Sequence, residues 1–247
     1  MSNWLPLGDS GLVINNFANE FLLVRRQPAT GPLADFSLPA WCGQFLEQQS
    51  PLASIVNIIA TEVEVCVQLA EQTSTAELGQ VIAELTSSLA AWRDEELAAA
   101  SARIWRLPVC FSEYDWIAVE QASGLLRSEV IERLLQTRLQ VAMFGFLPGF
   151  VYLTGLAPDL HIPRKATPDV RSPRGALALG GPYVGVYSLP SPAGWHVIGT
   201  IGVELLEIDR LPPIVLRPGD HVELQSISIA QLTELQSSKV NVEEFNS

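Results

Sequence analysis

Cysteine and histidine are scarce in this sequence, which has only three of each among 247 residues. Cys42, Cys66 and Cys110 lie far apart and form no C-x-x-C pair, so we expect buried thiols rather than redox partners. No histidine is close to a cysteine in sequence, so a catalytic cysteine would need the fold to bring a base beside it. The histidines also lack the spacing of a zinc site, and we expect no metal.

Long apolar segments are also missing. Glu62, Glu64 and Gln68 interrupt the longest candidates before they reach the length of about eighteen residues that a transmembrane helix needs, so we expect no membrane span. The first residues, MSNWLPLGDS, have no basic segment followed by an apolar one, which predicts no secretory signal and a cytoplasmic protein. Apolar residues make up 48% of the chain, enough to build packed cores.

Basic residues are outnumbered, and the net charge of -12 argues against nucleic acid as a partner because the phosphates would be repelled. One segment has the opposite balance. Residues 161–175 carry a local charge of +3, from Arg164, Lys165, Arg171, Arg174 and Asp169. The rest of the chain therefore carries -15. The segment is either a solvated loop or a receptor for a carboxylate or phosphate.

The two halves of the chain differ in composition. Residues 147–219 hold 11 of the 17 prolines and 10 of the 17 glycines. This density is incompatible with helices and predicts short strands joined by turns, as in a barrel or sandwich. We predict a small α/β domain over residues 1–102, a β-barrel domain over 103–229 and a C-terminal tail over 230–247.

In the first domain, strands and helices are expected to alternate. We predict a hairpin turning at Gly8-Asp9, a helix over Trp41–Gln49 and two strands within Ser54–Ala70, where TEVEVCVQL alternates at period two. Residues 75–100 have helical spacing of leucine and isoleucine with acids early. The alternation predicts a small sandwich of ferredoxin-like character.

In the second domain, RIWRLPVCF (103–111) is predicted to open the fold as a strand. Ala122–Arg138 is the one clear helix, and all that follows to about residue 229 is expected to be strand and loop. The tail is expected to begin as a helical turn and to end in disorder.

The most unusual stretch is FGFLPGFVYL (144–153), where Phe144, Phe146, Phe150 and Tyr152 share one parity around a turn at Pro148-Gly149. By itself this pattern is compatible with core packing. Downstream come the basic segment and GGPYVGVYSLPSPAGWHVIG (180–199), whose glycines recur at strand ends and permit close approach of the backbone.

The order of these motifs, followed by PPIVLRPGDHVEL, resembles the family of the 5-oxoprolinase B subunit, also called allophanate hydrolase subunit 1 or KipI. PLGDSGLVINNF and LPVCF are similar to the opening hairpin and to the first strand of the second domain of that family. The resemblance implies an α+β protein with a ferredoxin-like domain followed by a cyclophilin-like β-barrel.

The resemblance also implies partners. With the A and C subunits of 5-oxoprolinase, the latter separate or fused, such a chain forms an ATP-dependent amidohydrolase that converts 5-oxoproline to L-glutamate. The chain has no G-x-x-x-x-G-K-[ST] loop, so ATP must be bound in another way, shared, or held by a partner. We expect the chain alone to hydrolyse neither ATP nor 5-oxoproline. The alternative is a KipI-like regulator that inhibits a sensor histidine kinase. A free-standing prolyl isomerase would rest on the barrel type alone.

Several polar positions of the family pattern are changed here. The histidine of a His-Thr pair is absent from Leu135-Gln136-Thr137, a serine is replaced by Ala176, and an arginine is missing from Gly199-Thr200-Ile201. Such losses remove groups that polarise a carbonyl, which favours the regulator, whereas the retained arginines favour the enzyme.

The resemblance and the residues together predict a binding site for a small carboxylate. Its members are Phe146, Gly149, Phe150, Tyr152, Arg164, Arg171, Arg174, Tyr187 and Trp195. Arg164 and Arg171 are expected to form its anion-receiving edge, unless they pair with surface acids instead. No nucleophile or general base is assigned.

Overall fold

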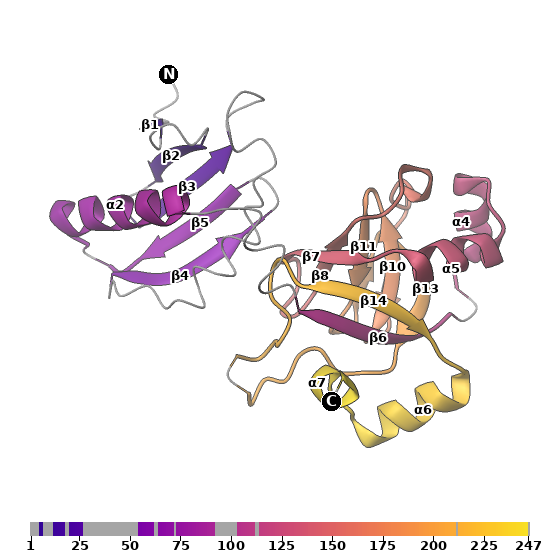
Figure 1. Ribbon diagram of the computed structural model, residues 1–247. Coiled ribbons are helices and arrows are strands. Elements are labelled where there is room, and N and C mark those ends of the chain that lie inside the picture. The colour runs from indigo at the N-terminus through magenta and orange to yellow at the C-terminus, as the bar shows by residue number, and fades with distance from the viewer. Residues whose placement is uncertain are drawn as a thin grey trace. The chain divides into compact units, whose positions relative to one another are not determined.

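The computed structural model describes residues 5–6, 12–17, 20–26, 54–61, 64–71, 73–91, 103–111, 114–210 and 212–246. The chain divides into two compact units, Met1–Ala102 and Arg103–Ser247. Both units combine helices with β-sheet (Figure 1), and in the second unit strands β6 and β14 pair in parallel. The α+β class that the sequence predicted, with a closed barrel in the second unit, is therefore confirmed.

The first unit contains one antiparallel sheet in the order β1-β2-β3-β5-β4. Its strands are β1 (Leu5–Pro6), β2 (Leu12–Phe17), β3 (Phe21–Arg26), β4 (Ile55–Ala60) and β5 (Glu64–Leu69). Strand β5 alternates between half-buried and buried residues, as its period of two predicted. Val65 and Val67 of β5 pair with Val24 and Leu22 of β3, and all four side chains are fully buried.

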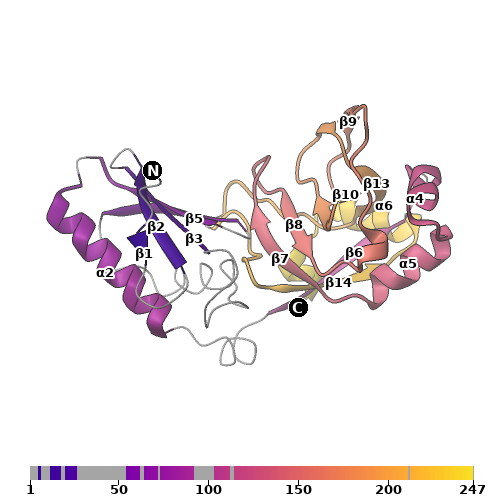
Figure 2. The same cartoon turned by 90° about the horizontal axis from the view of Figure 1, so that it is seen from above.

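Helix α2 (Thr75–Ala91) lies along one face of this sheet (Figure 2). Ser74 and Glu77 begin it with a reciprocal cap, because each side chain accepts the backbone N–H of the other. Hydrogen bonding of the Glu77 carboxylate with the side chain and the backbone N–H of Ser74 lowers the pKa of Glu77. Val81 and Leu85, one helical turn apart, are fully buried. The predicted helix is thus confirmed up to Ala91.

The two strands of the predicted hairpin are present, since Leu5 and Pro6 pair antiparallel with Ile14 and Val13. Its predicted turn at Gly8-Asp9 and the predicted helix over Trp41–Gln49 lie outside the described residues.

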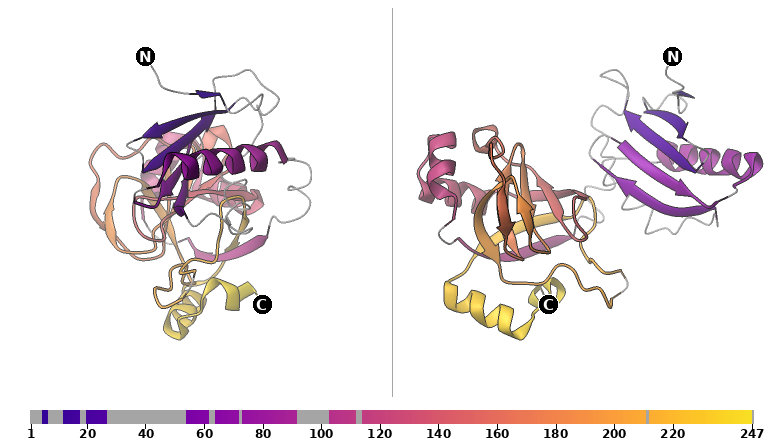
Figure 3. Two further views of the ribbon diagram at one scale, coloured as in Figure 1. Left: turned by 90° about the vertical axis from the view of Figure 1, so that its left-hand side faces the viewer. Right: turned by 180° about the vertical axis from the view of Figure 1, so that it is seen from behind.

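The second unit is built around a closed barrel in the order β10-β11-β8-β7-β14-β6-β13 (Figure 3). Its strands are β6 (Ile104–Cys110), β7 (Leu139–Phe144), β8 (Val151–Thr154), β10 (Ala176–Gly180), β11 (Tyr183–Val186), β13 (His196–Ile201) and β14 (His221–Ser226). Leucine, valine and isoleucine side chains from all seven strands share one apolar core. The strand predicted over 103–111 is confirmed as β6.

Two helices stand where the sequence predicted one. Helix α4 (Trp116–Ser123) ends at Gly124, which adopts the left-handed conformation at φ 71°, and α5 (Arg127–Gln136) follows. The prediction of a single helix over Ala122–Arg138 was therefore wrong in its first residues. A left-handed glycine is a common helix terminator, and it separates the two helices here.

The predicted C-terminal tail is also corrected. Residues 229–246 form helices α6 (Ile229–Ser238) and α7 (Val242–Asn246) rather than a turn and a disordered end. Ser228 and Gln231 form a capping box at the start of α6. Val242 is buried, and the Asn246 side chain accepts the backbone N–H of Arg106 on β6 at 2.8 Å. These contacts attach the segment to the barrel.

A two-stranded arm, β9 (Asp169–Ser172) with β12 (Ser191–Ala193), completes the second unit and stands away from the barrel in Figure 2. A short 3₁₀ helix, η1 (Pro158–Leu160), precedes it.

None of the described helices has the length and apolar character needed to cross a membrane. Cys66 and Cys110 are free thiols, and burial raises the pKa of Cys66.

Candidate functional site

The candidate site lies on the outer face of four neighbouring barrel strands. Pairing places Tyr152 of β8 beside Gly185 of β11, Gly185 beside Ala178 of β10, and Ala178 beside Val197 of β13. The flanking residue Leu153 belongs to the barrel core. Because side chains alternate along a strand, the row from Tyr152 to Val197 faces away from that core.

Small residues on this outer face make room for large rings. A Cβ atom on Gly180 would lie 2.3 Å from the Trp195 ring, and one on Gly185 would lie 2.6 Å from Trp195 and 2.7 Å from Phe150. Such distances are impossible for real side chains, so both positions require glycine while Trp195 keeps its place. The close approach predicted for the glycines of this segment is present at these two positions and at Gly199, where a Cβ atom would lie 2.8 Å from the carbonyl oxygen of Cys110, but not at Gly181, where it would meet nothing within 4 Å.

Phe150 is the centre of an aromatic cluster that consists of Phe146, Phe150, Tyr152, Tyr183, Tyr187 and Trp195. Its ring lies edge-on to four others, with centroids 4.7 Å from Tyr152, 4.8 Å from Tyr187, 5.6 Å from Phe146 and 5.7 Å from Trp195. Edge-on pairs at these separations are favourable for aromatic quadrupoles. The rings therefore hold one another in fixed orientations.

The turn between β7 and β8 brings Phe146 to this cluster. Gly149 has φ 75°, and a Cβ atom there would lie 2.9 Å from Leu206 and 3.0 Å from Ser188, so only glycine fits. The Ser188 hydroxyl donates to the carbonyl of Pro148 and fastens the turn. Phe146 itself has φ 63°, which is costly for a residue with a side chain, and the residue is 62% exposed. The turn thus presents an exposed ring beside buried ones.

Arg164 is the cation of this surface. Its guanidinium carbon lies 5.6 Å from the centroid of the Trp195 ring, within the range of a cation–π contact. The Arg164 side chain is exposed, and it forms no ion pair with any residue that the structure describes. Its charge is therefore available to an anion.

Burial in the cluster changes the acidity of two tyrosines. Desolvation raises the pKa of Tyr187 to about 12, and the nearby Tyr152 adds to this shift, while Arg164 acts in the opposite direction. Desolvation also raises the pKa of Tyr152, again against Arg164. Both phenols are thus neutral hydrogen-bond donors near pH 7.

The structure brings most of the predicted site residues together: Phe146, Gly149, Phe150, Tyr152, Arg164, Tyr187 and Trp195. Arg171 lies on β9, exposed and without a ring contact to the cluster within the described part of the chain. Arg174 lines a separate groove of about 600 Å³, where its guanidinium lies 3.3 Å from the Glu204 carboxylate. Arg174 is thus paired with a surface acid, whereas the pairing considered for Arg164 and Arg171 is found for neither among the described residues.

Sequence reasoning missed Tyr183, whose ring stacks on Trp195 with an interplanar angle of 13°. It shares the parity of Gly185 on β11, and this signal was readable. Lys165 was counted only as a charge, although its ammonium bridges Asp115 and Asp169. No sequence signal pointed to Asp115, which lies 50 residues earlier.

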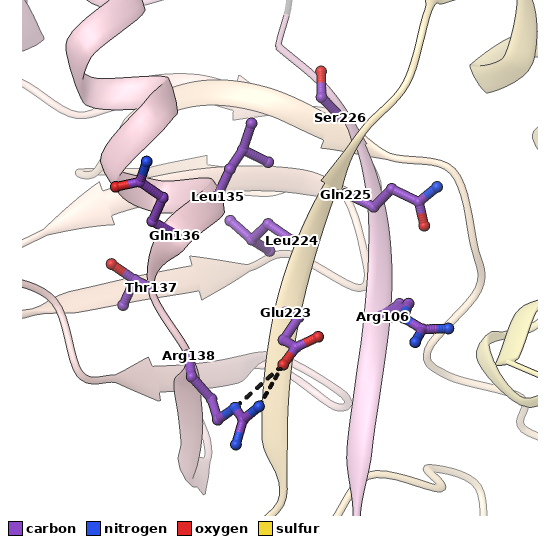
Figure 4. Close-up of a pocket in the computed structure, with 9 residues that line it drawn as sticks. All are labelled: Arg106, Leu135, Gln136, Thr137, Arg138, Glu223, Leu224, Gln225 and Ser226. Atoms are coloured by element: carbon purple, nitrogen blue, oxygen red, sulfur yellow. Dashed lines mark hydrogen bonds and ion pairs between the residues drawn. The ribbon is translucent and has the colours of Figure 1, made fainter.

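A second groove, of about 660 Å³, lies between the end of α5 and strand β14 (Figure 4). Arg138 reaches across it and donates two hydrogen bonds to Glu223, at 2.9 and 3.2 Å. Leu135, Gln136 and Thr137, where the resemblance led us to expect a histidine, line this groove and not the aromatic cluster. The altered helix end and the cluster are therefore different places on the barrel.

The cluster combines aromatic rings with phenol donors and a guanidinium. Among the described residues, no histidine is hydrogen-bonded to a serine, threonine or cysteine, and no group of acids, histidines and cysteines is arranged to hold a metal ion. Rings, phenol donors and one guanidinium suit a small ring that carries a carboxylate.

Comparison with known proteins identifies the family of the chain. The family described as "Carboxyltransferase domain, subdomain C and D" matches residues 13–216. The B subunit of 5-oxoprolinase from Escherichia coli O157:H7 is 37% identical over 134 residues, covering 53% of this chain and 62% of that protein. The corresponding B subunit of Bacillus subtilis (strain 168) is 36% identical over 129 residues, covering 51% and 54%. The matches thus span little more than half the length of these relatives.

Among solved structures, the protein TTHA0988 superimposes with a TM-score of 0.67 at 26% identity, covering 84% of this chain and 40% of that one. The resemblance to the family of the 5-oxoprolinase B subunit that the motif order predicted is confirmed by the names of both curated relatives. The chain therefore belongs to the family of carboxyltransferase domains, subdomains C and D, and within it resembles the B subunit of 5-oxoprolinase.

Proposed function

We propose that this chain is the B subunit of an ATP-dependent 5-oxoprolinase-like complex and that its aromatic cluster binds the substrate. The observation that carries the proposal is the unpaired guanidinium of Arg164 above Trp195, at the edge of six packed rings. 5-Oxoproline is a five-membered lactam with one carboxylate. The carboxylate suits a guanidinium, and the ring methylenes suit aromatic faces.

The polar tips of the cluster support the same ligand. The hydroxyls of Tyr152 and Tyr187 and the indole N–H of Trp195 form no hydrogen bond with other residues that the structure describes, and none of these atoms is a buried polar atom without a partner. These three donors are therefore accessible to water or to a ligand. Neutral phenols and an indole N–H can donate to the lactam oxygen, so a bound lactam would take the place of water at these donors.

The A and C subunits of the complex would supply what this chain does not. Hydrolysis adds water across the lactam C–N bond and gives L-glutamate, and ATP drives it because the lactam is unreactive. The sequence has no phosphate-binding loop of the P-loop type, and the described residues offer no nucleophile with its base. We place ATP and the bond-breaking groups with the partner subunits, and we expect the chain alone to be inactive.

The test is titration calorimetry of the purified chain with 5-oxoproline and, separately, with ATP. Arg164→Ala should weaken 5-oxoproline binding by about ten- to a hundredfold, since a charge-assisted hydrogen bond of about 1.5–3 kcal/mol is lost. The melting temperature should stay nearly constant because Arg164 is exposed.

The matched control is Arg138→Ala, which removes the same side chain from the Glu223 ion pair outside the cluster and should leave the affinity unchanged. Equal affinities of wild type and Arg164→Ala, or a large drop in melting temperature, would contradict the proposed role of Arg164.

The changed helix end favours a second candidate, a KipI-like regulator of a sensor histidine kinase. Leu135-Gln136-Thr137 lacks the family histidine in the groove of Figure 4. Co-elution decides between the two functions. A stable complex with a co-expressed C subunit of 5-oxoprolinase supports the enzyme, and binding to a kinase domain without binding to that C subunit supports the regulator.

A further inference from the structure

Arg164 is held between two residues that are themselves attached to the barrel. The carbonyl of Pro163 accepts a hydrogen bond from Nε2 of His196 at 3.1 Å, and the backbone N–H of Lys165 donates to the carbonyl of Gly194 at 2.8 Å. Gly194, Trp195 and His196 are consecutive, so these two bonds place Arg164 opposite Trp195. The backbone therefore sets the register of the cation–π contact.

The Lys165 side chain adds a third attachment. Its ammonium lies 2.6 Å from Oδ2 of Asp115 and also donates to the carboxylate of Asp169, and the side chain is only 11% exposed. The same Oδ2 of Asp115 accepts the backbone N–H of Val197 at 2.7 Å, while the Asp115 N–H donates to the Val197 carbonyl at 2.9 Å. Lys165 thus links the segment that carries Arg164 to strand β13, two residues beyond Trp195.

The charge and the burial of the Lys165 ammonium are consistent with a role in holding the two carboxylates together. Burial alone would lower the pKa of Lys165, but its hydrogen bonds to Asp115 and Asp169 outweigh this, and the pKa is raised. The ammonium is therefore fully charged at neutral pH, with both carboxylates engaged. Arg164, by contrast, has a ring contact and no ion pair in the described part of the chain.

We propose that Lys165 is a positioning residue, which holds the Arg164 guanidinium over Trp195 by bridging Asp115 and Asp169. The contribution of Lys165 to ligand binding rests on the proposed function and passes through Arg164. A purely stabilising Lys165 would instead affect folding and leave the place of the guanidinium unchanged.

The first arm of the test needs no ligand. The ring current of Trp195 should shift the Nε–H signal of Arg164 in the nuclear magnetic resonance spectrum. This signal is assigned by its disappearance in Arg164→Lys. Lys165→Met should move this signal towards that of a free arginine, and Lys165→Arg should restore most of the displacement. An unmoved signal in folded Lys165→Met overturns the proposal.

The second arm measures affinity for 5-oxoproline in a double-mutant cycle. Lys165→Met should weaken binding by about tenfold in the wild-type background and by less than about twofold in the Arg164→Ala background. Equal losses in both backgrounds would show that Lys165 does not act through Arg164. Arg138→Met, which removes one positive charge elsewhere, should leave the affinity unchanged.

Two outcomes keep the proposals separate. A signal that moves while 5-oxoproline binds to no variant, wild type included, supports the positioning role and rejects the proposed ligand. If Lys165→Met does not fold, Asp169→Asn is used instead. The Asp169 side chain is 46% exposed, and this substitution removes only one of the two carboxylates that Lys165 bridges. Asp169→Asn should move the signal in the same direction by a smaller amount, and no movement overturns the proposal.

Discussion

The two faces of the barrel strands β8, β10 and β11 are built from different kinds of residues. Towards the core, Leu153, Leu177, Leu179 and Val184 are fully buried branched side chains. On the outer face, alanine and glycine alternate with them and form a shallow floor, on which the aromatic cluster rests. The comparison teaches that the same strands provide stability with one face and, with the other, carry the surface that we propose binds the ligand.

Leu179 and Gly180 are neighbours on β10 and point to opposite faces, so substitutions at these two positions test the difference between the core face and the outer face. The largest expected effect is that of Leu179→Ala, which leaves a cavity in the barrel core and should lower the free energy of unfolding by about 2–5 kcal/mol. Denaturant titration measures the loss. The affinity of the folded fraction for 5-oxoproline should be unchanged, and a loss of affinity as large as that of Arg164→Ala would break the separation of the two faces.

Gly180→Ala should give the opposite result. Its Cβ atom would lie 2.3 Å from Trp195, so the indole must move, at a cost of about 1–3 kcal/mol. Binding of 5-oxoproline should weaken by about tenfold or more because Trp195 and the guanidinium above it are displaced together. Calorimetry and denaturant titration of one sample give both values.

The matched control for Gly180→Ala is Gly79→Ala on helix α2, where a Cβ atom would meet nothing within 4 Å. It should leave binding unchanged and raise stability by up to about 1 kcal/mol, since glycine disfavours a helix. Unchanged affinity in Gly180→Ala would mean that the ligand does not use Trp195.

The smallest expected effect concerns tyrosine ionisation. Tyr187 should ionise near pH 12 in an ultraviolet titration of the folded protein. Its pKa is raised above the ordinary value of 10.0, so the folded state holds the proton more tightly, and stability should fall as the pH rises from about 10 towards 12. Arg164→Ala should raise the pKa of Tyr187 and Tyr152 further. Ionisation of Tyr187 in the ordinary range would indicate that the outer cluster is open to water.

Much of the fold could be predicted from local pattern. The period of two in Glu64–Leu69 and the helical spacing after Thr75 are properties of neighbouring residues, and both elements formed as predicted. The errors at α4 and α6 fell where a short local signal was overlooked. Gly124 terminates α4, and the Ser228-Gln231 pair caps α6.

The aromatic cluster was predictable in part for the same reason. Phe150 and Tyr152 share a face because side chains alternate along a strand, and the motif order supplied Tyr187 and Trp195. The glycines indicated close backbone approach, but not which ring approaches them. Pairing of β8, β11 and β10 decides that Trp195 fills the space above Gly180 and Gly185.

The sequence by itself determined the mixed α+β class, the strands and helices with clear periodicity, and a basic segment between two aromatic ones. Only the tertiary structure decided that Arg164 meets Trp195, that Arg171 stays on the exposed arm, and that Arg174 meets Glu204. These three arginines lie within eleven residues. Each carries the same charge, so the sequence alone does not tell which of them meets a ring, which meets an acid and which meets neither. Their partners come from segments distant in sequence, which only the paired strands bring together.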